Sequence, residues 1–378
     1  MVGDERGAKY DEEDGKRRRR PTFPAHAIEY IGGPRRPWRV LIGSARPLLV
    51  GAGLASVAYL VAQTGVEALL DPLRVLSWRL AVFLVLPYAV VGLLHTVAWR
   101  LVFVHAPASL RRLFLIRLAG EALNLGTASV GGEPVKIYLL RPGVPLSEAS
   151  AVQVVDKTAI TIGQVLFLAV GLAVALPQFE LAPDFVRAMF ILFGVQIVAV
   201  IGFVRVQCVG IGGWTLRLLD RFGLATGERA RGLAGFDRAL ALAYRERRGA
   251  VVGCVLVHLL GWLAGSLEVY LVLRWLGIGA PLTMALAIDA FGTGIKFLAF
   301  AIPGAIGVLE GGYMVVFGAF GLGGGLGLSF TLVRRLRMVV WSLVGLVVLA
   351  WLRAAPVVAG GPEMAPRPPV ARGAPAKP

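Results

Sequence analysis

Long apolar segments recur along the chain, separated by polar or glycine- and proline-broken stretches. A helix needs about 20 predominantly apolar residues to cross the ~30 Å hydrocarbon core of a bilayer. Within these segments apolar and polar residues do not alternate, as they would in the strands of a membrane barrel. The pattern predicts an all-α polytopic membrane protein with about six full spans, at residues 47–63, 79–99, 150–176, 186–206, 250–273 and 328–352.

Two polar tails flank the apolar region. Residues 1–46 are charged and contain the basic run "KRRRR", whereas residues 356–378 are rich in Pro, Gly and Ala, a composition typical of disorder. Between the tails we expect a single transmembrane domain, residues 47–355.

The formal net charge of +16 comes with a strongly basic N-terminal tail. A basic run is compatible with nucleic-acid binding, but beside a membrane span it is more typical of a cytoplasmic segment that contacts anionic lipid headgroups. We therefore expect membrane lipid as a partner and no nucleic acid.

The segment 207–248 interrupts the spans and carries more arginine than acidic residues, which places it in the cytoplasm. Apolar residues recur in it at helical spacing, at Leu233, Phe236, Leu240 and Tyr244. This spacing predicts an amphipathic helix at the membrane surface. Together with the basic N-terminal tail, it predicts that both termini of an inner-membrane protein are cytoplasmic.

Two further segments are too polar and too broken to be ordinary spans. In 110–145 a polar stripe falls on one helical face, at Arg117, Glu121 and Asn124, and the helix is expected to break at Gly131 and Gly132 and to restart at Pro134. In 281–322 the corresponding stripe is Asp289, Thr293 and Lys296, the break is at Pro303 and Gly304, and Glu310 follows.

The two broken segments share a spacing of charges. Lys157 follows Glu133 by 24 residues, and Arg334 follows Glu310 by 24 residues. The expected topology makes the first segment enter from the cytoplasm and the second from outside. We therefore predict two re-entrant helical hairpins in an inverted repeat, which is a layout that transporters use to build a site at mid-membrane. Broken backbone at that depth must be buried or line a wet cavity.

Charges within the span 150–176 leave two interpretations open. A charge near the bilayer centre costs about 2.5–3.5 kcal/mol, so Asp156 and Lys157 need partners or water. One interpretation is an ion pair of Lys157 with Asp156 or Glu133 that only holds helices together. The other is a lipid-headgroup or proton site, since the two broken segments converge on the same region.

The remaining charges are also ambiguous. Glu133 and Glu310 are compatible with simple helix caps as well as with a site. The cluster Arg334, Arg335 and Arg337 fits either side chains that reach the outer membrane interface or an anion site, for example for phosphate. His258 and Glu268 are weaker candidates, the first as a packed polar residue and the second as one that reaches water.

Several motifs are absent from the sequence. It has no Gly-x-x-x-x-Gly-Lys-Ser/Thr phosphate loop, no His/Cys cluster with metal-ligand spacing and no Gly-x-Ser-x-Gly nucleophile motif. We therefore expect no cofactor, no metal and no catalytic residue set, and transport that uses no nucleotide hydrolysis.

Three stretches carry a family resemblance: "GGEPVKIYLL", "LSEASAVQVVDKTAITIGQVLFLAVGL" and "IPGAIGVLEGGY", followed by the late arginine cluster. With these, residues 45–355 resemble the lysylphosphatidylglycerol synthase transmembrane-region family, also called flippase-like. The form "GGEPVK…VVDKT" is also similar to the branch that includes hopanoid-biosynthesis-associated membrane proteins.

The resemblance implies a membrane domain that moves or presents a lipid. Its first motif falls on Gly132, Glu133 and Lys136, and its second on Pro303, Gly304 and Glu310, with the arginine cluster after it. Many relatives have Glu-Arg where this chain has Asp156 and Lys157. The cytosolic transferase domain of some members is absent, so lysyl transfer by this chain alone is not expected.

The sequence thus favours a flippase-like transporter of an anionic or polar lipid, more than an enzyme. The Arg cluster or Lys157 would receive the headgroup, and Glu133 and Asp156 would gate or neutralise it. One alternative is a membrane-embedded enzyme or accessory subunit in headgroup modification. Another is a scaffold that recruits a soluble lipid-modifying partner through the segment 207–248.

Overall fold

The structure is a computed structural model that describes residues 79–104, 109–125, 131–141, 143–222, 227–299, 302, 305 and 307–354. The expected first span 47–63, both tails and the expected break at Pro303 and Gly304 lie outside these residues. Every regular element in the described part is a helix, and the described chain contains 11 helices.

Five of these helices are long and apolar enough to cross a membrane. They are α3 (Arg79–Leu101), α6 (Leu146–Ala175), α7 (Pro183–Val209), α10 (Arg248–Trp275) and α13 (Gly324–Ala354). Each lies within a few residues of an expected span, so the prediction of an all-α polytopic membrane protein is confirmed.

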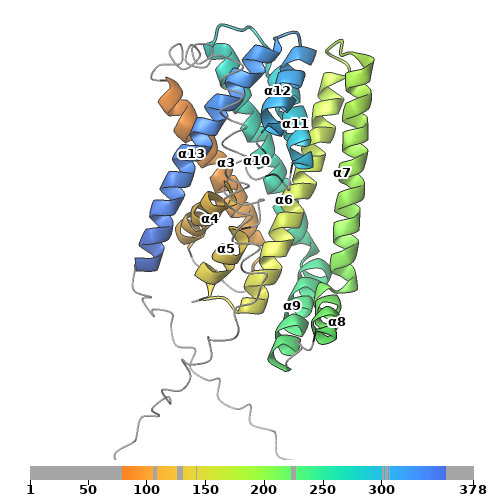
Figure 1. Cartoon of the computed structure of the whole chain (residues 1–378), viewed down its shortest axis with the longest axis vertical. Coiled ribbons are helices and arrows are strands. Elements are labelled where there is room, and N and C mark those ends of the chain that lie inside the picture. Colours follow the sequence, from red (N-terminus) through yellow and green to blue (C-terminus); the bar gives the residue numbers. More distant parts are fainter. Residues whose placement is uncertain are drawn as a thin grey trace, which may run out of the picture. The chain divides into compact units, whose positions relative to one another are not determined.

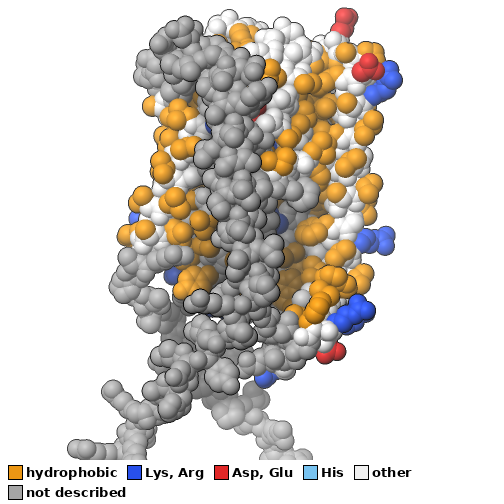
Figure 2. Space-filling view, viewed as in Figure 1, with side chains coloured by type: hydrophobic (Ala, Val, Ile, Leu, Met, Phe, Trp, Pro, Cys, Tyr) orange, Lys and Arg blue, Asp and Glu red, His pale blue; other side chains and the backbone are white. Residues whose placement is uncertain are grey.

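Helix α7 has the surface expected of a helix in contact with lipid. Large apolar side chains point outward along its length, among them Ile191, Val198 and Val206, which are 68%, 71% and 58% exposed. Figure 2 shows hydrophobic side chains over this flank, with charged side chains gathered mostly toward the two ends. A soluble protein would not leave so much contiguous apolar area exposed.

Five of the described helices are too short to cross a bilayer, and four of them build the two broken segments. These four form two pairs, α4 (Leu110–Leu125) with α5 (Glu133–Leu140), and α11 (Leu282–Leu298) with α12 (Val308–Ala319). At 1.5 Å per residue α4 is about 24 Å long and α5 about 12 Å. Figure 1 shows the two pairs in opposite halves of the helix bundle, and these are the two broken hairpins that the sequence predicts.

The helices before and after α7–α9 repeat one order: long, short, short, long. Helix α4 packs against α13, and the corresponding helix α11 packs against α6, while α3 and α10 pack against each other. In Figure 1, α3 and α10 run in opposite directions. The two halves are thus related by inversion.

The segment between the halves forms α8 (Ile211–Arg221) and α9 (Gly227–Glu246). The apolar stripe of α9 faces the protein, because Leu240 is buried and α9 packs against α6. Tyr244 donates a hydrogen bond to Gln207 Oε1 at 2.6 Å, and burial raises the pKa of its hydroxyl, which stays protonated at neutral pH. The exposed apolar side chains of the pair lie on α8 instead, at Trp214 and Leu218.

Two apolar cores hold the described helices together. One contains Phe291, Tyr313 and Phe317 from the α11–α12 hairpin, and the other contains Trp99, Leu113 and Leu140 around the α4–α5 hairpin. Each hairpin therefore has its own apolar support. The polar stripes of both hairpins line one cavity.

Candidate functional site

A cavity of about 420 Å³ lies among the two hairpins and the long helices α3, α6, α10 and α13. The polar stripes of both hairpins reach it, with Glu121 and Asn124 from α4 and Asp289, Thr293 and Lys296 from α11. The charged side chains that line it are Arg117, Glu121, Lys136, Asp156, Lys157, Glu268, Asp289, Lys296, Arg334 and Arg337.

The break between α4 and α5 is held by a side chain. The backbone N–H of Gly132 donates to Asn124 Oδ1 at 2.8 Å, which satisfies a backbone group exposed by the break. Gly132 also lies so close to α4 that a Cβ would come within 2.0 Å of the Gly120 carbonyl oxygen. Helix α5 begins at Glu133, one residue before the expected restart at Pro134, which lies in its first turn.

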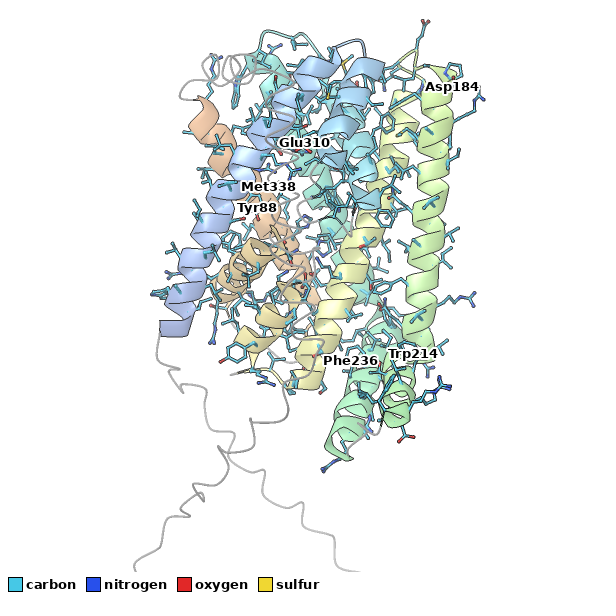
Figure 3. The ribbon with its side chains drawn as sticks, in the orientation of Figure 1. Tyr88, Asp184, Trp214, Phe236, Glu310 and Met338 are labelled. Atoms are coloured by element: carbon cyan, nitrogen blue, oxygen red, sulfur yellow. The ribbon has the colours of Figure 1, made fainter. Side chains whose placement is uncertain are left out.

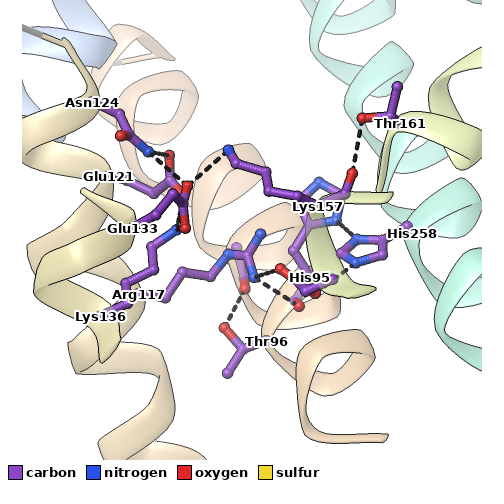
Figure 4. A network of polar contacts seen from close by, with 12 residues as sticks. His95, Thr96, Arg117, Glu121, Asn124, Glu133, Lys136, Lys157, Thr161 and His258 are labelled. Carbon is purple, nitrogen blue, oxygen red and sulfur yellow. Dashed lines mark hydrogen bonds and ion pairs between the residues drawn. The ribbon is translucent and has the colours of Figure 1, made fainter. Parts of the chain in front are cut away.

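Four charged side chains cluster at this break. Lys136 is buried, and its Nζ lies 2.6 Å from Glu121 Oε1 and 3.3 Å from Glu133 Oε2. Lys157 of α6 places its Nζ 2.9 Å from Glu133 Oε1 (Figure 4). Two carboxylates thus share two ammonium groups, which lowers the cost of burying Lys136 and Glu133 beside the partly exposed Glu121 and Lys157.

Asp156 does not pair with its neighbour Lys157, because successive residues on a helix point in different directions. Its Oδ1 lies 2.9 Å from His258 Nε2, and its Oδ2 lies 3.4 Å from Arg117 Nη1. His258 Nδ1 lies in turn 2.7 Å from His95 Nδ1. The result is a buried polar chain across α4, α6, α10 and α3 (Figure 4).

Sequence reasoning missed this chain as a unit. It singled out Asp156 and Arg117 separately, took His258 as a weak candidate and did not consider His95. The available signal was a histidine within an otherwise apolar span, since polar residues inside membrane segments need partners.

The second half of the site is built around Arg334. Its guanidinium lies 2.8 Å from Asp289 Oδ1 and 3.2 Å from Glu268 Oε2, and it also donates to the hydroxyl of Tyr313. Arg337 pairs with the same Glu268. Figure 3 shows Tyr88 and Met338, which also line the cavity, in the middle of the bundle.

These contacts overturn two of the interpretations drawn from the sequence. Glu268 is only 1% exposed and does not reach water, because Arg334 and Arg337 hold it inside the protein. The arginines do not reach outward to the membrane interface, because their side chains are 12–14% exposed and paired with carboxylates.

Glu310 makes two polar contacts with described residues. Its Oε2 accepts a hydrogen bond from the backbone N–H of Gly307 at 2.7 Å, which is a cap on α12, and its Oε1 lies 2.6 Å from Arg335 Nε. The partner of Glu310 is therefore Arg335 and not Arg334, the residue picked out by the shared spacing of 24.

The cavity has a formal excess of positive charge, since six of its charged lining residues are basic and four are acidic. Most of the cations are matched by carboxylates. Lys296 is exposed, lines the cavity and has no carboxylate within ion-pair distance among the described residues. The side chain of Lys157 is also 38% exposed. An anion in the cavity would meet these two ammonium groups.

One group of side chains has the composition of a metal site. Within the described residues, ligand atoms of Asp156, Cys254 and His258 lie within 4.8 Å of one another. Both ring nitrogens of His258 are already hydrogen-bonded, and the guanidinium of Arg117 faces the carboxylate. A cation placed there would be repelled by Arg117, so the donor set suits a hydrogen-bonded chain better than a metal.

Comparisons with known proteins agree with this architecture. Residues 41–347 match the family described as "Lysylphosphatidylglycerol synthase TM region". A UPF0104 membrane protein of Methanothermobacter thermautotrophicus is 24% identical to the chain over 309 residues, an alignment that covers 76% of this chain and 90% of the relative. No solved structure matches the chain.

Proposed function

The chain belongs to the lysylphosphatidylglycerol synthase transmembrane-region family, and on that premise we propose that this integral membrane protein moves or presents an anionic lipid across the inner membrane. The observation that carries the proposal is the cavity between two inverted hairpins, with an excess of basic side chains and two accessible ammonium groups.

The headgroup site is assigned to Lys157 and Lys296. They come from opposite halves of the repeat, and both line the same cavity. Arg334 and Arg337 are held by carboxylates, so they shape the site and contribute less to headgroup binding. A phosphate or other anion between the two ammonium groups would gain charge-assisted hydrogen bonds from both halves at once.

Glu133 and Asp156 are assigned to gating. In the absence of an anion, Glu133 neutralises Lys157 at 2.9 Å. A headgroup that binds Lys157 competes with this carboxylate, so binding would loosen the contact between α5 and α6. Such competition is a physical route from headgroup occupancy to movement of a hairpin.

The test is a leaflet-resolved assay on purified protein in phosphatidylcholine vesicles. A fluorescent phosphatidylglycerol is followed into the opposite leaflet, with a fluorescent phosphatidylcholine as the neutral-headgroup reference. We expect faster movement of the anionic probe, and a severalfold loss in Lys157→Gln and in Lys296→Gln. Arg187→Gln, which changes an exposed cation on α7, should behave as wild type.

A second readout comes from cells that lack the protein. A lipid that accumulates in one leaflet at unchanged total amount supports transport. A lipid species that disappears contradicts it and points to headgroup chemistry or to a soluble partner enzyme. The assigned headgroup site would also be ruled out if the anionic and the neutral probe moved between leaflets at equal rates in wild type and in every variant.

A further inference from the structure

The polar chain beside the cavity does not bind the headgroup in the proposal above, and Asp156 is its one member with a role there, in gating. It runs from Arg117 through Asp156 and His258 to His95, and all four side chains are buried. Burial of four polar side chains is costly unless every one is satisfied. Arg117 completes the arrangement, because it also donates to the backbone carbonyl of His95 at 3.0 Å.

One proton lies in the hydrogen bond between the two histidines. Their Nδ1 atoms lie 2.7 Å apart, so one nitrogen must donate and the other must accept. Asp156 faces Arg117 and is therefore an acceptor, so His258 Nε2 donates to it at 2.9 Å. In the neutral pair, His95 Nδ1–H then donates to His258 Nδ1.

A second proton can enter without loss of any of these hydrogen bonds. If His95 takes a proton on Nε2, the shared proton moves from His95 Nδ1 to His258 Nδ1. His258 then carries the positive charge and donates from both ring nitrogens, to His95 and to Asp156. His95 lines the cavity and His258 does not, so the proton enters from the cavity side.

The positive charge added to the histidine pair would raise the electrostatic potential at the anion site. The groups that face the pair are Arg117 and Glu121 on α4, Asp156 and Lys157 on α6, and Cys254 and Trp262 on α10. In the neutral state Asp156 balances Arg117. One added proton makes this side of the cavity more positive and therefore favours an anion.

We propose that the His95–His258 pair, held against Asp156, is a proton-binding site whose occupancy is coupled to an anionic headgroup in the cavity. Coupling between two sites is reciprocal, so a bound anion also favours proton uptake. Histidine suits this role because each of its two ring nitrogens can either donate or accept a hydrogen bond, so a proton can be added while both contacts are kept. The inference rests on the proposed function and adds a driving force, since lipid movement would then respond to a proton gradient.

The experiment uses the phosphatidylglycerol assay with and without an imposed pH gradient. We expect a gradient of one polarity to accelerate movement severalfold in wild type, and His258→Gln to lose this acceleration. Thr158→Val is the matched control. It removes the buried hydrogen bond that Gln207 of α7 donates to Thr158. Thr158 lies on the same helix as Asp156 but does not line the cavity. This variant should keep the response to the gradient.

A second measurement separates this inference from the proposed function. Short-chain phosphatidylglycerol is added to detergent-solubilised protein in weak buffer, and proton uptake is read with a pH-sensitive dye. We expect uptake by wild type and none by His258→Gln, with His95→Asn as a second variant if the first does not fold.

The outcomes are distinct. Lipid movement that is equal with and without the gradient, or a gradient response that survives in His258→Gln, overturns the proton site while transport stands. If wild type moves no lipid, transport fails, and the dye measurement still decides whether anion and proton bind together. No uptake in that measurement overturns the inference.

Discussion

The side chain of Lys136 lies directly over Gly120, where an added Cβ would come within 2.5 Å of Lys136 Cε. In the second half Tyr313 lies over Gly292 in the same way, with 2.3 Å between the added Cβ and the ring carbon Cζ. Each side chain carries its polar end to a carboxylate of the helix that it crosses. The same packing of a long side chain over a glycine occurs in both hairpins, which supports an origin of the two halves in one repeated unit.

A close backbone approach in the first hairpin predicts a stability effect. Gly132→Ala would place a Cβ 2.0 Å from the Gly120 carbonyl oxygen, so α5 must move away from α4. Overpacking of this kind costs about 1–3 kcal/mol. We expect a lower apparent melting temperature in detergent, followed by tryptophan fluorescence. Gly194→Ala on α7, where a Cβ meets nothing within 4 Å, should melt at or above wild type, and equal melting of the two variants would contradict the packing.

Arg334 is predicted to be essential for stability. Arg334→Gln leaves Asp289 buried without its cation and weakens the hold on Glu268. Removal of one partner from a buried pair costs about 3–5 kcal/mol. We expect a large fall in the apparent melting temperature, partly restored when Asp289→Asn is added. A double variant no more stable than Arg334→Gln would show that the pair is not the cause.

Glu133→Gln tests the gating role that is proposed for Glu133. The change leaves Lys157 without the carboxylate at 2.9 Å, so the cavity becomes more positive while the size of the side chain is kept. We expect phosphatidylglycerol to bind more tightly, as measured by native mass spectrometry, and to move more slowly between leaflets. The matched control is Glu180→Gln, which changes a carboxylate in the α6–α7 link away from the cavity. Full transport activity in Glu133→Gln would exclude the gating role.

The direction of α7 can be tested from outside the cell. Figure 3 shows Asp184 at one end of this helix and Trp214 just beyond the other. In a Cys208→Ser background, a membrane-impermeant maleimide should label Asp184→Cys in intact cells. The same reagent should label Arg217→Cys only after the cells are permeabilised. Cys254 is fully buried and should react in neither case. The reverse pattern would place α8 and α9 outside.

The hydropathy pattern was sufficient to predict the fold class. The five described long helices lie close to the expected spans because a segment of about 20 apolar residues has few alternatives to a membrane helix. The two broken hairpins were also predictable, since glycines, prolines and a polar stripe at helical spacing are local signals. Local signals also located most of the charged residues that line the cavity.

Which charges pair was decided by the tertiary structure. The spacing of 24 residues picked Lys157 for Glu133, which the structure places together, but Arg334 for Glu310, whose partner is Arg335. Glu268 was expected to reach water and is instead buried between arginines. The His95–His258 contact joins residues 163 apart in the chain. Partners are set by the packing of distant helices and by rotation of each helix about its axis, and a shift of one residue on a helix turns a side chain by about 100°.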